Sequence, residues 1–180
     1  MNRSTFSRPH WFAILLGVSV LISMTPRLAA ADQPSQLAPL AFLTAHEWEA
    51  KLPDSPDGKK ESIRAHFTWS ESRQAIRFSN QFVTDGKAVP YAEGMYAWNP
   101  EKKTIVFMYV GAEGNFTEGT VQLKDGVLVH EFQEIKADGK AAQYVARVTP
   151  HGTESWDNAI FARKGDALTP LVQVQYLPAK

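Results

Sequence analysis

Turn signals interrupt the chain about every ten residues between residues 53 and 170, and the segments between them have the composition of β-strands. Four of these signals are Asp-Gly pairs, whose residues tolerate the positive φ angles of a tight type I′ hairpin turn. They are Asp57-Gly58, Asp85-Gly86, Asp125-Gly126 and Asp138-Gly139. Short hairpins at this spacing predict an all-β fold in which consecutive strands are antiparallel neighbours.

The segments between the turns predict ten strands, and almost no chain is left for helices. The strands are expected near residues 46–52, 60–69, 75–84, 89–98, 104–110, 115–123, 127–135, 141–149, 155–163 and 170–177. Closing this meander into an up-and-down, lipocalin-like barrel would remove its exposed edges. The apolar segment from Ser35 to Leu43 is expected to form a short helical plug at one end, despite Pro39. A two-sheet sandwich is the alternative architecture.

The first residues have the form of a secretory signal peptide. Basic residues precede an apolar run over residues 11–24, which is short for spanning a bilayer, and alanines at 29–31 suit a cleavage site. We therefore predict a signal peptide over 1–31, a mature domain over 32–180, and a periplasmic or secreted location. An uncleaved anchor is the alternative, and no stable membrane span is expected after cleavage.

Composition excludes several classes of function. The chain has no cysteine, so disulfides, thiol nucleophiles and thiolate metal ligands are excluded. The whole chain has 19 basic and 19 acidic side chains. The charged side chains of residues 1–31 are all basic, so the mature domain is mildly acidic. Without a basic stripe, nucleic acid is not an expected partner. The sequence carries no signal for an oligomeric state.

Tight turns also predict which residues face one another across the sheet, because a hairpin fixes the register of its two strands. Following the predicted turns gives one row of neighbours: Phe78, Glu93, Tyr109, Glu118, Gln133 and Tyr144. The next row on the same face is Ile76, Met95, Phe107, Thr120, Glu131 and Ala146. Apolar residues alternate with polar ones along 75–84, which predicts that this face points into the barrel.

These rows suggest a ligand site inside the barrel. Phe78, Met95 and Phe107 would line the body of a small hydrophobic ligand. The polar end of that ligand would be oriented by a polar row made of Glu93, Tyr109, Glu118, Gln133 and Tyr144. A water-filled interior, or a polar row that faces outward, is the alternative interpretation of the same residues.

Three short motifs resemble a known structural family. Residues 40–43 (Leu-Ala-Phe-Leu) followed by Trp48 resemble the calycin pattern, in which a short helix leads into a first strand with a tryptophan. The segments 93–98 and 115–119 resemble those of uncharacterised exported bacterial lipocalin-like barrels. His46-Glu47 stands where a glycine is usual in that pattern. The resemblance covers nearly the whole mature chain and implies a barrel whose members bind diverse ligands.

Nitrobindin-like barrels are a more distant resemblance, in which a late histidine binds haem iron. The last predicted strand has no histidine, so no haem or other cofactor is expected, and no close pair of histidines predicts a metal site. Noncatalytic binding of a small hydrophobic ligand is the function that we expect. The alternatives are an enzyme that uses Glu93 and Glu118 as an acid–base pair, and an exported protein-interaction module with a filled interior.

Overall fold

The structure is a computed structural model that describes residues 36–53 and 57–180. A 3₁₀-helix, η1 (Ala38–Ala45), precedes the strands. The strands are β1 (Trp48–Lys51), β2 (Glu61–Trp69), β3 (Ala75–Thr84), β4 (Lys87–Asn99), β5 (Thr104–Gly111), β6 (Phe116–Lys124), β7 (Val127–Ile135), β8 (Ala141–His151), β9 (Ser155–Lys164) and β10 (Ala167–Pro178). The all-β prediction is therefore confirmed.

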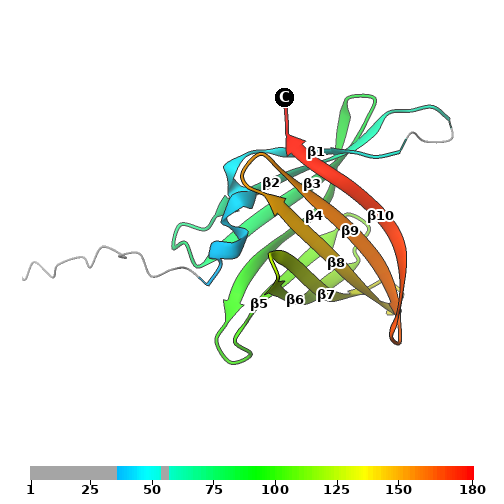
Figure 1. The fold of residues 1–180 in the computed structure, drawn as a ribbon. Helices are drawn as coiled ribbons and strands as arrows, with labels where there is room; N and C mark the ends of the chain where they lie inside the picture. Colours follow the sequence, from blue (N-terminus) through cyan, green and yellow to red (C-terminus); the bar gives the residue numbers. More distant parts are fainter. Residues whose placement is uncertain (1–35, 54–56) are drawn as a thin grey trace, which may run out of the picture. The chain divides into compact units, whose positions relative to one another are not determined.

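The ten strands form one closed up-and-down barrel. Each strand pairs antiparallel with the next along the chain, and β1 pairs with β10, so that Ala50 lies beside Tyr176 (Figure 1). Closure gives every strand a partner on both sides and removes the open edges of a meander. The barrel prediction is confirmed, and the two-sheet alternative is wrong.

Two of the predicted Asp-Gly turns have the backbone of a type I′ hairpin. Asp85 and Gly86 have φ angles of 49° and 79°, and Asp125 and Gly126 have φ angles of 50° and 81°. Both residues of each pair are thus in the left-handed region, as this turn requires. These turns set the β3–β4 and β6–β7 pairings at their hairpin ends.

Two prolines lie beside the irregularities in this sheet. The β3–β4 register shifts by one residue at Tyr91, directly after Pro90. The β9–β10 register shifts at Leu171, directly after Pro170. A proline has no backbone N–H to donate, so inside a sheet it is tolerated mainly at edges and bulges. Both of these prolines coincide with bulges.

One end of the barrel is covered by η1. Leu40 and Leu43 are buried in the same cluster as Trp48, at the start of β1, and Trp156, at the start of β9. The Trp48 Nε1 donates a hydrogen bond of 2.7 Å to the Leu43 carbonyl oxygen. The predicted helical plug is thus present at residues 38–45.

Other parts of the N-terminal prediction are not reached by the structure. Ser35, where the helical segment was expected to begin, lies outside the described residues, and so do the predicted signal peptide 1–31 and its cleavage site. Within the described residues, none of the helices has the length and apolarity that crossing a bilayer requires.

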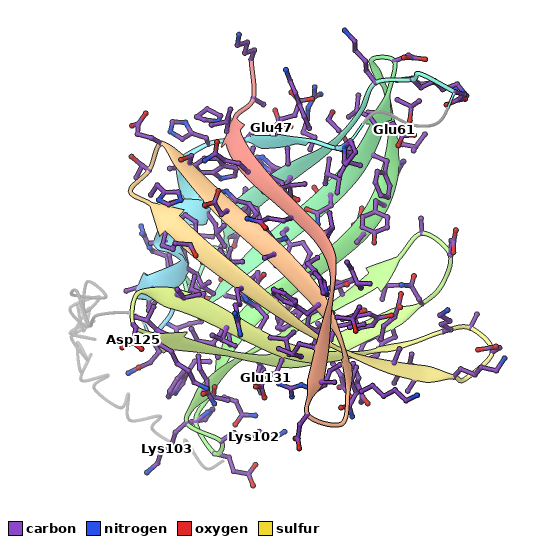
Figure 2. The ribbon with its side chains drawn as sticks, turned by 45° about the vertical axis from the view of Figure 1, so that its right-hand side comes forward. Glu47, Glu61, Lys102, Lys103, Asp125 and Glu131 are labelled. Carbon is purple, nitrogen blue, oxygen red and sulfur yellow. The ribbon has the colours of Figure 1, made fainter. Side chains whose placement is uncertain are left out.

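The two ends of the barrel are made of different turns. The β4–β5 turn with Lys102 and Lys103 and the β6–β7 turn with Asp125 lie at the η1 end, as the order of up and down strands requires. Figure 2 places these three residues on one side of the barrel and Glu61, at the start of β2, on the opposite side. The end without η1 is called the open end below.

Candidate functional site

The observed register differs by one residue from most of the predicted pairings. Phe78 faces Gly94 instead of Glu93, because the bulge at Tyr91 adds a residue to β4. Tyr109 faces Gly94 and Thr117 instead of Glu93 and Glu118. The β4–β5 and β5–β6 loops each differ by one residue from their expected lengths, and every such difference exchanges the two faces of the sheet.

Four predicted site residues consequently lie on the outer face. Glu93, Met95 and Glu118 are exposed, Met95 to 40%, and Gln133 is half-buried beside Glu118. The Glu118–Gln133 pairing is the one step of the predicted row that is confirmed, and the Gln133 Nε2 donates a 2.9 Å hydrogen bond to Glu118 Oε1. The prediction that these four residues share an inner wall is wrong.

Glu131 also lies outside the barrel, where Arg163 forms an ion pair with it at 3.0 Å. The Arg163 guanidinium, as hydrogen-bond donor, lowers the pKa of the Glu131 carboxyl. A carboxylate buried inside the barrel would need a partner, whereas Glu131 is exposed and already paired with Arg163.

The other predicted site residues lie on the inner face. Phe78, Phe107 and Tyr109 line a cavity of about 350 Å³ inside the barrel. Tyr144 lies on the same face near the open end, with its ring stacked on Phe132 at a centroid distance of 5.4 Å. The aromatic side chains that line the cavity are Phe67, Phe78, Phe82, Tyr91, Tyr96, Phe107, Tyr109, Phe132, Trp156 and Tyr176.

The cavity wall also carries polar atoms that have no hydrogen-bond partner among the residues that the structure describes. These are the Oδ1 atoms of Asn80 and Asn158 and the Nε1 of Trp156. A buried polar atom without a partner costs about 1–3 kcal/mol, and nearly all such atoms in folded proteins find one. The wall is thus mainly aromatic, with a few polar atoms available to a bound molecule.

A buried His130–Tyr96 pair forms another part of this wall. The His130 Nε2 lies 3.4 Å from the Tyr96 hydroxyl, and its Nδ1 lies 3.4 Å from the Leu128 carbonyl oxygen. Burial lowers the pKa of His130 to about 4, although the Leu128 carbonyl acts in the opposite direction. The imidazole is therefore neutral at pH 7, and burial likewise raises the pKa of Tyr96. The inner wall at this point is uncharged.

A carboxylate and three tyrosines gather at the open end. Glu134, near the end of β7, faces Thr117, which in turn faces Tyr109. The Tyr144 hydroxyl lies 3.4 Å from one Glu134 oxygen, and the Asn115 side-chain amide donates a hydrogen bond to the other. This group of four residues, Tyr91, Tyr109, Glu134 and Tyr144, is called the mouth cluster below.

The phenols of the mouth cluster are held in their neutral form. Burial raises the pKa values of Tyr91, Tyr109 and Tyr144, and the negative charge of Glu134 raises all three further. At neutral pH the cluster therefore contains three hydroxyl groups, which can donate hydrogen bonds, and one acidic side chain.

Glu134 was missed as an inner residue because the predicted register put Gln133 inside. Two signals in the sequence could have corrected this. Pro90 in the middle of a strand indicates a bulge, and including one extra residue there pairs Phe78 with Gly94. Along β7, Phe132 stands between the polar residues Glu131 and Gln133, and Glu134, two residues further on, shares its face.

The described residues contain no group of three His, Asp or Glu side chains that could hold a metal ion. No protein-family model matches the chain, and no curated protein matches it.

Proposed function

We propose that this protein is an exported, lipocalin-like barrel that binds one small, mainly hydrophobic molecule in its interior without catalysing a reaction. The observation that carries the proposal is the cavity of about 350 Å³ with its largely aromatic wall. Its volume lies near the lower end of the range found for small-molecule sites, which favours a compact ligand. The few polar atoms on the wall would orient that ligand.

The Oδ1 atoms of Asn80 and Asn158, which have no partner in the described part of the chain, support binding over a purely structural interior. A packed core would have apolar side chains at these inner positions, since buried polar atoms without partners destabilise a fold. Binding would supply the missing hydrogen bonds. Export is proposed from the signal-peptide pattern of residues 1–31 and from the resemblance to exported lipocalin-like barrels.

The acid–base alternative loses its geometric basis with the corrected register. Glu93 and Glu118 lie outside the barrel, and each faces an apolar residue of β5, Val110 and Met108 respectively. Glu118 and Glu93 line two different hollows of the surface, so the described geometry does not bring both carboxylates onto one reacting group. We therefore retain binding as the proposed function.

A fluorescent probe and two matched variants test this proposal. The probe is N-phenyl-1-naphthylamine, a neutral apolar molecule that brightens when it leaves water. Ala146→Phe would fill the cavity, because Ala146 lies on its wall opposite Ile160. Ala159→Phe makes the same change on the outer face, where Ala159 lies opposite Arg147. Thermal unfolding of both variants checks that they are folded.

We expect the mature protein to bind the probe with one-site stoichiometry, and we expect Ala146→Phe to weaken binding at least tenfold. Ala159→Phe should bind as the unaltered protein does. Native mass spectrometry of gently purified protein should also detect a reproducible small molecule. If neither the probe nor any co-purified molecule is bound by folded protein, the interior is structural and the proposal is wrong.

A further inference from the structure

We infer that the ligand carries a protonated amine at its polar end, and that the mouth cluster binds this amine at the open end of the barrel. The inference rests on the proposed function, because it assigns a chemical class to the molecule in the cavity. It is carried by Glu134, an acidic side chain on the inner face whose neighbours are tyrosines and an asparagine.

Glu134 is half-buried and has no cationic partner within the part of the chain that the structure describes. Its two oxygens contact the Asn115 amide and the Tyr144 hydroxyl, and none of the ion pairs in that part of the chain includes it. By contrast, Glu131 on the outer face has Arg163 at 3.0 Å. A half-buried carboxylate without a cation favours a positively charged group beside it.

The tyrosines of the mouth cluster also favour a positively charged ligand. Tyr91 and Tyr109 line the cavity, and Tyr109 lies two strands from Glu134 on the same face, with Thr117 between them. Aromatic rings attract an ammonium group through their negative faces, and a carboxylate beside several rings is a common way to hold an amine. The apolar part of the ligand would then extend past Tyr109 to Phe78 and Phe107, whose rings lie 6.0 and 6.4 Å from that of Tyr109.

The same arrangement disfavours anionic ligands. A fatty-acid carboxylate at the open end would face Glu134, and no basic side chain of the inner wall offers it compensation among the residues that line the cavity. Like charges in a partly desolvated site repel each other. The barrel should therefore distinguish ligands of equal length by the charge of their polar ends.

Three molecules of the same chain length test the inference: octylamine, octanol and octanoate. Each is titrated at pH 7 against the protein that has bound N-phenyl-1-naphthylamine, and the loss of fluorescence gives its affinity. The test variant is Glu134→Gln, which removes the charge and keeps the shape. The matched control is Glu118→Gln, which makes the same change on the outer face of the neighbouring strand β6.

We expect octylamine to bind roughly tenfold more tightly than octanol, and octanoate to bind most weakly. Glu134→Gln should bring octylamine to the affinity of octanol and should leave octanol unchanged, whereas Glu118→Gln should change none of the three. Octanoate binding as tightly as octylamine, or an octylamine affinity unaffected by Glu134→Gln, would overturn the inference. In either case, probe binding that is still lost in Ala146→Phe would leave the proposed function standing.

Discussion

Inner residues alternate with outer ones at both ends of the barrel, but they are covered at one end and accessible at the other. At the η1 end, the inner residue Trp48 of β1 is 0% exposed, because it packs in one cluster with Leu40 of η1, which is also 0% exposed. At the open end, no helix among the described residues covers the wall, and Tyr91 is 38% exposed while Glu134 is half-buried. One end is a sealed core that stabilises the fold, and the other is an accessible wall that can select a ligand.

The largest effect should come from opening the sealed end. Trp48→Ala removes a fully buried ring that contacts Trp156 at a centroid distance of 6.2 Å, and it also removes the hydrogen bond to Leu43. We expect a loss of about 3–5 kcal/mol in the free energy of unfolding, measured by urea denaturation. Leu177→Ala is the control, since Leu177 is 51% exposed and should change stability by less than about 1 kcal/mol. Equal losses in both would contradict the comparison.

Acid should destabilise the interior through His130. Its pKa is about 4 in the folded protein and about 6.5 when unfolded, so the unfolded chain binds the extra proton between these values. The stability contributed by the neutral imidazole is therefore complete above pH 6.5 and decreases as the pH falls toward 4. The loss should reach about 3 kcal/mol.

Urea denaturation at several pH values measures this contribution. His130→Gln, which cannot titrate, should have a shallower decrease in stability between pH 6.5 and pH 4 than the unaltered protein. His66→Gln removes an exposed histidine from the outer face of β2 and should retain the original slope. If all three proteins have the same slope, His130 is not held neutral by the fold.

A smaller effect is expected from Gly94, which lies on the inner face toward the open end. A Cβ at this position would collide with the Met108 carbonyl oxygen, with Tyr109 Cβ at 2.5 Å and with Phe78 Cζ at 2.8 Å. Gly94→Ala should cost about 1–3 kcal/mol by overpacking. Glu93→Ala, one residue away on the outer face, should cost less than about 0.5 kcal/mol. If Glu93→Ala cost more stability than Gly94→Ala, the result would support the predicted register and contradict the observed one.

The smallest effect on stability is expected at the open end itself. Tyr91→Ala removes a ring that is 38% exposed and contacts Phe82 at a centroid distance of 4.4 Å. We expect a loss of about 1 kcal/mol or less in unfolding free energy, together with weaker binding of N-phenyl-1-naphthylamine. Fluorescence titration and urea denaturation of the same sample separate the two effects. A loss as large as that of Trp48→Ala would show that the open end is also core.

The sequence was sufficient to predict the strands because turn chemistry is local. Asp85-Gly86 and Asp125-Gly126 adopt the turn that these residue types favour. Which residues face inward depends instead on the number of residues in each loop and bulge. One extra residue at Tyr91 placed Glu93 on the outer face. Phe78 was predicted correctly as an inner residue because apolar residues alternate with polar ones along 75–84. Phe107 and Tyr109 were predicted correctly because two one-residue differences, at the β4 bulge and in the β4–β5 loop, cancel each other.

The mouth cluster could not be predicted from the sequence for a related reason. Glu134 and Tyr91 come from strands that are not neighbours, β7 and β4, and their common position toward the open end follows from the arrangement of the whole sheet. Pairwise register links each strand only to the next one. A residue that interacts across the barrel opening can be identified only when the closed structure is known.

Closure of the barrel also constrains when the protein can complete its folding. The last pairing joins β1 to β10, with Ala50 beside Tyr176, so no part of this contact can form before the C-terminal strand has been synthesised. Until then, the growing chain has two unpaired strand edges, and such edges readily pair with other chains. We therefore expect a chain shortened before β10 to aggregate, and the completed chain to depend on protection of those edges until its final residues are available.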